Sequence, residues 1–136
     1  MTTRRDARRL AIDVLYQADI TGAEPEDVLA SWREAERHVP PFAEELIYGV
    51  VEALPEVDLL LEEHAEGWTV ARMAALDRTI LRVAVYELRH RADVPPSVAI
   101  SEAVEAASEL SSDESKAFVN GILGRIAREP GGASEA

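Results

Sequence analysis

The amino-acid sequence predicts an all-α fold of about seven helices, packed as two lobes of three-helix type. Two observations support this fold class. Every long segment repeats its apolar residues with the period of an amphipathic helix, and the chain contains no alternating β-type run and no Asn-Gly hairpin signal. The length of 136 residues and the 47% of hydrophobic residues are typical of one globular domain. We find no internal repeat.

The first predicted helix covers residues 3–20, where apolar side chains recur three and four residues apart. Thr2 or Thr3 can cap its N-terminus, and Gly22 ends it. Pro25 then starts a second helix, because proline fits the first helical turn and two acidic residues follow it.

The third predicted helix begins at Pro41, where a Pro-Pro pair has ended the second. Pro55 either kinks this helix or starts a fourth, and the sequence leaves both alternatives open. Gly67 ends this half of the chain. We therefore expect an N-terminal lobe over residues 1–66.

The second lobe is expected over residues 67–129, and it begins with a short helical turn after Thr69. Residues 77–90 form a helix with apolar side chains on two sides, so we place it between neighbouring helices as a central strut. Arg82 and Glu87 lie between those two sides, where we expect them to form structural ion pairs or to reach a boundary of the core. A Pro-Pro pair then separates this helix from the next.

The last predicted helix follows Ser111 and Glu114, which are spaced as a capping box. Two glycines, Gly121 and Gly124, interrupt its pattern, and each costs about 1 kcal/mol relative to alanine. We expect them to permit the close approach of another helix or of a ligand backbone. Residues 130–136 are expected to be a flexible tail.

The charge of the chain is unevenly distributed. The net charge is −12, yet the first nine residues hold four arginines against one aspartate, a net +3, so the remaining residues carry −15. An acidic protein repels nucleic acid unless its basic residues are gathered in one place. The N-terminal helix is such a place.

A helical wheel puts Arg5, Arg9 and Tyr16 on one stripe that faces away from the helix's own apolar side, with Arg4 and Arg8 on the flank. Arginine holds phosphates and a phenol ring stacks on an unpaired base, so this stripe favours single-stranded RNA as a ligand. In the alternative interpretation, Tyr16 packs under a neighbouring helix and the arginines form a solvated helix end.

The sequence contains little that indicates an enzyme. The chain has no cysteine, which excludes disulfides, thiolate metal sites and thiol catalysis, and it lacks the common nucleophile, zinc-protease and phosphate-binding motifs. The three histidines lack metal-ligand spacing, and we interpret the glutamate clusters at 62–66 and 102–109 as solvated faces. We therefore expect a cytoplasmic protein without catalytic residues, cofactor or metal, because no membrane-spanning or signal segment is present either.

Four motifs together resemble the NusB family, from Arg4 to about Arg128. In order, they are Arg4-Arg5-Asp6-Ala7-Arg8-Arg9 with Leu15-Tyr16; Trp68, Arg72 and Asp77-Arg78-Thr79-Ile80-Leu81-Arg82-Val83-Ala84-Val85-Tyr86-Glu87-Leu88; Pro95 with Val98-Ala99-Ile100-Ser101-Glu102-Ala103-Val104-Glu105; and Phe118-Val119-Asn120-Gly121-Ile122-Leu123. The family usually has Asn where this chain has Ser101, a mild change.

The resemblance implies a NusB-like fold and a role in transcription antitermination and termination. It implies binding to boxA RNA of ribosomal RNA operons, a heterodimer with NusE (a small-subunit ribosomal protein), and assembly with other Nus factors on RNA polymerase. The RNA-binding residues it implies are Arg4, Arg5, Arg8, Arg9, Tyr16, Lys116 and Phe118. Asp77, Arg78 and Glu114 are expected near the RNA or the protein partner.

The resemblance leaves two alternatives open. NusB-like domains also occur at the N-terminus of some RNA methyltransferases, and a self-associating helical adaptor could cover the stripe of Arg5, Arg9 and Tyr16 in a homodimer. The basic run here is diluted by Asp6, and about four phosphate contacts give weak, salt-dependent binding. We therefore expect NusE to supply additional positive charge.

Overall fold

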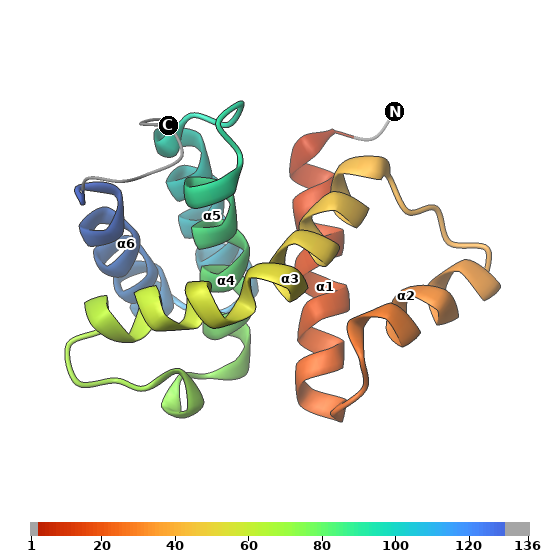
Figure 1. Ribbon diagram of the computed structural model, residues 1–136, viewed down its shortest axis with the longest axis horizontal. Coiled ribbons are helices and arrows are strands. Elements are labelled where there is room, and N and C mark those ends of the chain that lie inside the picture. The colour runs from red at the N-terminus through yellow and green to blue at the C-terminus, as the bar shows by residue number, and fades with distance from the viewer. Residues whose placement is uncertain (1–2, 130–136) are drawn as a thin grey trace.

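The computed structural model describes residues 3–129, and within that range every regular element is helical. Figure 1 shows six α-helices and one short 3₁₀ helix. They are α1 (Arg4–Thr21), α2 (Pro25–Glu34), α3 (Pro41–His64), η1 (Val70–Arg72), α4 (Ala75–His90), α5 (Pro96–Leu110) and α6 (Asp113–Ala127). The all-α prediction is confirmed, with six α-helices rather than seven. The predicted tail, 130–136, and the alternative cap Thr2 lie outside the described residues.

Helix α3 resolves the alternative at Pro55, because it continues through this residue without starting a fourth helix. Proline removes one helical N–H donor and leaves the carbonyl of Val51 without its helical partner. Both residues are exposed, so water can satisfy that carbonyl. Figure 1 shows α3 running from the side of α1 and α2 to the side of α4, α5 and α6. Since α3 packs against α1, α4 and α6, the division into lobes near Gly67 stays a prediction.

Helix α4 is the central element, as its two apolar sides predict. It packs against α1, α3, α5 and α6. Leu81 and Val85 are fully buried on one side of α4, and Ile80 and Val83 are buried on the other. The core is therefore one continuous apolar cluster to which all six α-helices contribute.

Local side chains define the helix ends. Thr3 and Asp6 form a reciprocal capping box at the N-terminus of α1, and Gly22 follows its last turn with a φ of 78°. The capping box predicted from Ser111 and Glu114 is wrong by one position. Ser112 caps α6, because its backbone is extended and its hydroxyl accepts a hydrogen bond from the Ser115 amide at 3.1 Å.

The close approach of another helix expected at Gly121 and Gly124 is not observed, while the alternative of a ligand backbone stays a prediction. A methyl group at either position would meet only the flexible guanidinium of Arg125 or Arg128, at 3.6 and 3.4 Å. The close approach occurs at Gly49 of α3 instead, where a Cβ atom would lie 2.2 Å from the ring of Tyr86 on α4. Gly49 therefore lets α3 and α4 pack with the tyrosine ring between them.

Candidate nucleic-acid interface

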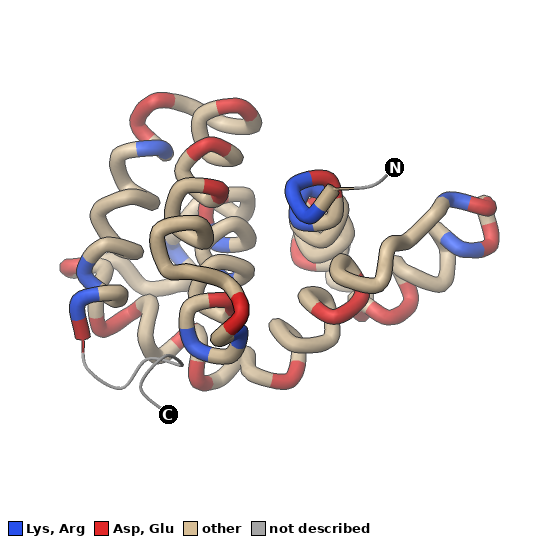
Figure 2. Tube along the Cα trace, turned by 90° about the horizontal axis from the view of Figure 1, so that it is seen from above, with Lys and Arg blue, Asp and Glu red and all other residues tan. Residues whose placement is uncertain are grey.

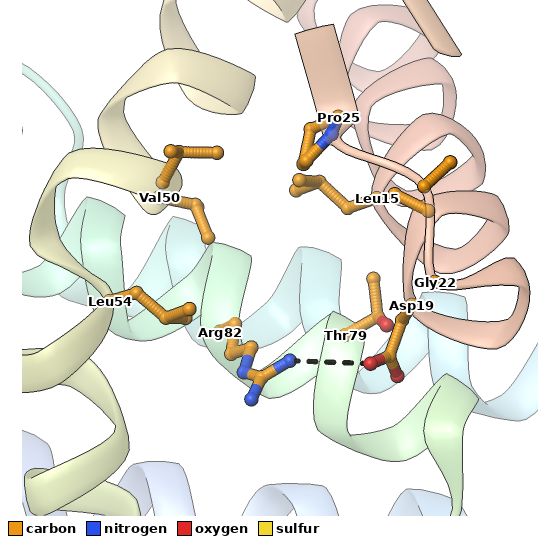
Figure 3. Close-up of a pocket in the computed structure, with 11 residues that line it drawn as sticks. Leu15, Asp19, Gly22, Pro25, Val50, Leu54, Thr79 and Arg82 are labelled. Atoms are coloured by element: carbon orange, nitrogen blue, oxygen red, sulfur yellow. Dashed lines mark ion pairs between the residues drawn. The ribbon is translucent and has the colours of Figure 1, made fainter. Parts of the chain in front are cut away.

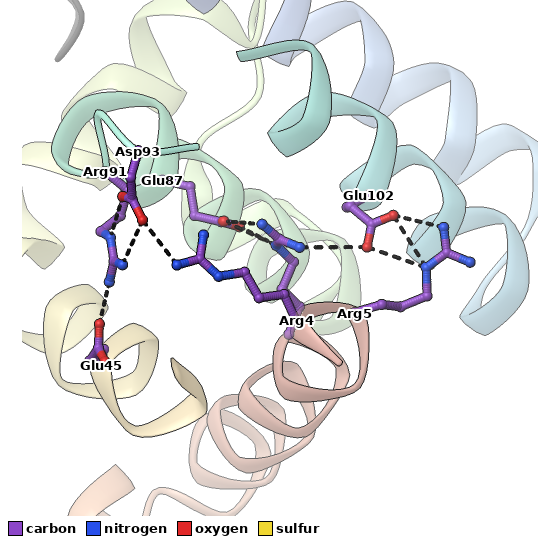
Figure 4. A network of polar contacts seen from close by, with 8 residues as sticks. Arg4, Arg5, Glu45, Glu87, Arg91, Asp93 and Glu102 are labelled. Carbon is purple, nitrogen blue, oxygen red and sulfur yellow. Dashed lines mark hydrogen bonds and ion pairs between the residues drawn. The ribbon is translucent and has the colours of Figure 1, made fainter. Parts of the chain in front are cut away.

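The exposed arginines of α1 face acidic side chains of α5. Arg5 donates hydrogen bonds to Glu102 at 2.8 Å and to Glu105 at 2.7 Å, and Arg9 pairs with Glu109 at 2.8 Å. Figure 4 shows Arg5 reaching from α1 to Glu102 on the neighbouring helix. The hydrogen bond from Arg5 holds the pKa of the Glu102 carboxyl below its ordinary value. The two helices thus face each other across a row of ion pairs.

Arg8 has a different position from the one the wheel predicts, because it is buried rather than exposed on the flank. Its guanidinium donates three hydrogen bonds of 2.8 to 3.0 Å to Glu87, which is itself 1% exposed, and it lies 3.6 Å from Glu102. The expected structural ion pair of Glu87 is confirmed. In this structure Arg8 links α1 to α4 through the core and presents no guanidinium to solvent.

Arg4 lies at the edge of a second polar network, also visible in Figure 4. It pairs with Asp93 at 3.0 Å, and its guanidinium lies 4.2 Å from the centre of the Phe42 ring. Arg91 contacts the same carboxylate and also bonds Glu45. Hydrogen bonds from Arg91 and then Arg4 lower the pKa of Asp93 far below its ordinary value.

Tyr16 is half-buried beside a pocket between α1, the start of α4 and the end of α5. The pocket has a volume of about 340 Å³, and its lining is Arg9, Ile12, Asp13, Tyr16, Leu76 and Leu110. Ile12, which the wheel puts near Tyr16 on the outer stripe, is 5% exposed because α4 and α5 cover it. The stripe therefore runs along the mouth of a groove and combines a cation, a phenol ring and apolar walls.

A second pocket of about 610 Å³ lies next to α6, and its lining includes three predicted residues, Asp77, Glu114 and Phe118. Trp68 also lines it and meets Phe118 edge to face, with ring centres 6.1 Å apart. Asp77 is buried, and one of its carboxylate oxygens has no hydrogen-bond partner among residues 3–129. The sequence analysis missed Trp68 as a site residue, although an aromatic residue directly after Gly67 was a usable signal.

Lys116 lies exposed on α6 and lines a shallow groove of about 670 Å³ that also includes Glu105 and Glu109 of α5. The same two glutamates pair with arginines of α1. The structure therefore places the acidic side of α5 between the cations of α1 and Lys116. Figure 2 shows a group of basic residues at the N-terminal end of α1 and others on α2, α4 and α6, while acidic residues occur on every α-helix.

Arg78 connects α4 to α1 and to the segment around η1 through hydrogen bonds. It donates hydrogen bonds to Asp19 at 2.6 and 3.0 Å and to the carbonyl oxygens of Val70 and Met73. Its neighbour Arg82 pairs with Asp58 at 2.9 Å, which confirms the ion pair expected for that residue.

An apolar groove of about 250 Å³ lies beside these ion pairs, between α1, α2, α3 and α4. Figure 3 shows Leu15, Val50 and Leu54 around it, with Arg82 and Asp19 facing each other. Val51 also lines it and is 44% exposed. This groove lies on α1 and α3, on surfaces that the sequence analysis did not single out.

Glu63, His64 and Glu129 bring three potential metal ligands within 4.8 Å of one another. Protein contacts already occupy the imidazole, because Nδ1 lies 2.7 Å from the Leu60 carbonyl oxygen and Nε2 lies 2.9 Å from Glu129. In the part of the chain that the structure describes, no helix is both long and apolar enough to cross a membrane.

Comparison with known proteins identifies relatives of this chain. The NusB family profile matches residues 5–128. A transcription antitermination protein NusB from Saccharopolyspora erythraea is 52% identical over 93% of this chain and 88% of its own length. The corresponding protein from Salinispora tropica is 47% identical over 93% of this chain and 96% of its own length. These names describe transcription factors, in agreement with the expectation of a non-enzyme.

Solved structures give the same assignment. T. maritima NusB superposes with a TM-score of 0.84 and 34% sequence identity, covering 94% of this chain and 92% of its own. A complex of the antitermination factors NusB and NusE with double-stranded RNA contains a chain with a TM-score of 0.82 and 26% identity, covering 92% of this chain and 96% of that chain. The fold and the sequence agree, and the chain belongs to the NusB family of transcription antitermination proteins.

Proposed function

We propose that this chain binds single-stranded boxA RNA of ribosomal RNA operons together with NusE, as part of a Nus-factor complex on cytoplasmic RNA polymerase. One observation carries the proposal: the four arginines of the N-terminal basic stretch end beside a pocket that is lined by Arg9 and Tyr16. Phosphate contacts and a stacking ring are the two elements of single-strand recognition. A related NusB has been solved with NusE and RNA, which supports the same partners here.

The proposed RNA path begins at the N-terminal end of α1. Arg5 and Arg9 contact phosphates, and an unpaired base enters the pocket beside Tyr16. A second base enters the pocket of Phe118 and Trp68, where the unpartnered oxygen of Asp77 accepts a hydrogen bond from a base N–H or NH₂ group. Leu76 lines the pocket of Tyr16, and Asp77 lines the pocket of Phe118 and Trp68. Since these two residues are consecutive on α4, the two pockets adjoin along one helix.

The proposed NusE surface is the apolar groove beside Arg78 and Arg82. Val51 lines this groove, and Ile20, 56% exposed, follows Asp19 of its lining. Exposed apolar residues beside such a groove are typical of a protein contact. The acidic first turn of α2 adjoins Pro25 of the lining and suits a basic ribosomal protein.

Few cations of this chain are free to hold phosphate, because Arg4, Arg5 and Arg9 form ion pairs and Arg8 is buried. We therefore expect weak and strongly salt-dependent binding by the chain alone, and tight binding when NusE adds its positive charge.

Fluorescence anisotropy tests the proposal. A labelled single-stranded boxA RNA is titrated at near-physiological salt with the chain alone and with the chain plus NusE. Tyr16→Ala removes the stacking ring and is expected to weaken the complex about 5- to 150-fold, since one stacked base contributes about 1–3 kcal/mol. Tyr16→Phe keeps the ring and serves as the matched control.

Scrambled and double-stranded RNAs of the same length complete the experiment. The proposal requires a preference for boxA that appears with NusE and disappears in Tyr16→Ala but not in Tyr16→Phe. Equal affinity for all RNAs in every arm would refute it. Sedimentation of the chain with and without RNA then tests the alternative of a homodimer that covers α1.

A further inference from the structure

We propose that Glu102, Glu105 and Glu109 of α5 set a threshold for RNA binding: their carboxylates compete with RNA phosphate for Arg5 and Arg9. A phosphate that binds the Nε–Nη2 edge of Arg5, or Nη1 of Arg9, must displace one of these carboxylates. The inference rests on the proposed function, because it concerns the same surface, and it assigns a role to an acidic face that the sequence analysis interprets as merely solvated.

The geometry supports direct competition. Arg5 donates hydrogen bonds to both Glu102 oxygens, at 3.3 and 2.8 Å, and a further one to Glu105 at 2.7 Å. Arg9 donates to Glu109 at 2.8 Å. A guanidinium binds phosphate most strongly when two parallel N–H groups donate to it. The carboxylates occupy the Nε–Nη2 edge of Arg5 and Nη1 of Arg9, so a phosphate that binds in this bidentate way at Arg5, or at Nη1 of Arg9, displaces a carboxylate.

Exposure separates these pairs from the buried one. The side chains of Arg5 and Glu105 are 51% and 40% exposed, and those of Arg9 and Glu109 are 24% and 54% exposed. Arg8 and Glu87 are 8% and 2% exposed. An exposed ion pair contributes little and exchanges with solvent ions, whereas breaking a buried pair leaves a desolvated charge without its partner. Arg5 and Arg9 are thus exchangeable, while Arg8 stays fixed.

The consequence is a threshold for binding. Each carboxylate lowers the affinity of any RNA by the strength of the pair that is broken. Only an RNA whose bases gain contacts beside Tyr16 and Phe118 offsets this loss. Random RNA offers phosphates without those base contacts, so the acidic face of α5 suppresses its binding at physiological salt.

The test compares the chain plus NusE as wild type with the double variant Glu105→Gln/Glu109→Gln. Glutamine keeps the side-chain length and a hydrogen-bond acceptor but removes the charge. Glu102 is left intact, because it also lies 3.6 Å from the buried Arg8. The control variant Glu34→Gln/Glu36→Gln makes the same change in net charge at exposed positions at and just after the C-terminal end of α2. Both variants are checked for unchanged helix content and unfolding midpoint.

We expect the affinity for scrambled single-stranded RNA to rise roughly 2- to 25-fold in Glu105→Gln/Glu109→Gln, because each exposed ion pair corresponds to a factor of about 1.5 to 5. The affinity for boxA RNA should rise by the same factor. The slope of log K against log salt should become steeper by about 1, since single-stranded RNA gives about 0.7 per phosphate neutralised. The control variant should change both affinities less than twofold, because salt screens charges beyond about 8 Å.

The outcomes are distinguishable. Affinities and salt slopes equal to those of the control variant would overturn the competition. A rise for scrambled RNA together with no boxA preference in the wild type would overturn the proposed function and leave the competition standing. A gain for boxA alone would also contradict the inference, because a carboxylate that competes for phosphate acts on every RNA.

Discussion

Replacing Arg8 with methionine tests whether this arginine is a structural residue or an RNA ligand. Arg8 is 6% exposed and directs three hydrogen bonds to Glu87. Methionine has a similar length and fills the same space without charge. The variant Arg8→Met leaves the Glu87 carboxylate, 1% exposed, without its cation in the contact between α1 and α4.

The expected loss is large. Removing one partner of a buried ion pair costs about 3–5 kcal/mol, because the remaining charge stays desolvated. A domain of this size has a total stability of about 5–15 kcal/mol. The variant should therefore lose a quarter or more of its stability, with a decrease in Tm of roughly 10 °C.

Urea denaturation followed by circular dichroism measures this change. The double variant Arg8→Met/Glu87→Leu removes both charges and should recover most of the loss, since apolar replacement of a whole buried pair is often neutral. Arg5→Met is the matched control: it removes an exposed arginine of the same helix and should leave the urea midpoint close to that of wild type.

One result would refute the reasoning. If Arg8→Met keeps the free energy of unfolding within about 1 kcal/mol of wild type while RNA affinity falls tenfold, Arg8 acts on RNA directly, as the sequence analysis predicts. A loss of stability that the double variant restores, with RNA affinity largely retained in that double variant, supports the structural role.

Three further predictions follow from local geometry. Gly49→Ala should lower the free energy of unfolding by about 1–3 kcal/mol, because the new methyl group displaces the Tyr86 ring. An unchanged midpoint in urea denaturation would contradict this packing. Gly121→Ala should stabilise α6 by about 0.5–1 kcal/mol in the same assay without weakening RNA binding; a weaker RNA complex would instead indicate a ligand contact at this glycine. Asp93 and Glu102 have lowered pKa values, so their pairing stabilises the fold above about pH 4.5 and is lost as the pH falls through their folded-state pKa values. Wild-type unfolding free energies should therefore fall more steeply between about pH 6 and about pH 3 than those of Asp93→Asn/Glu102→Gln, and parallel curves would argue against these ion pairs.

Several features of the fold are local in sequence, and for that reason they could be predicted. The capping box of Thr3 and the positive φ of Gly22 involve residues within a few positions of each other. The two apolar sides of the helix at 77–90 predict its central position, because a helix that is apolar on opposite sides needs neighbours on both. The shift of the α6 cap from Ser111 to Ser112 is a one-residue error, since adjacent serines offer the same hydroxyl and only the backbone conformation selects one.

In the candidate site, too, some features are local and could be predicted, while others depend on contacts between distant helices. Periodicity alone groups Arg5, Arg9 and Tyr16 on one stripe; in the structure Arg9 and Tyr16 line one groove, and Arg5 pairs with Glu102 of α5. Periodicity gives no information on what another helix brings opposite that stripe. The glutamates of α5 lie about a hundred residues away in sequence, so only the packing of α5 beside α1 makes them partners of the arginines.

By itself, the sequence determined the all-helical fold, most of the helix ends to within a few residues, and the family, because these depend on local patterns and on motifs. Only the tertiary structure decided which cations can meet a ligand. Arg8 and Arg9 are adjacent on one helix, yet Arg8 is buried against Glu87, 79 positions further along, while Arg9 stays partly exposed. The physical reason is that desolvation and ion pairing are set by neighbours in space, and a helical wheel describes only one helix.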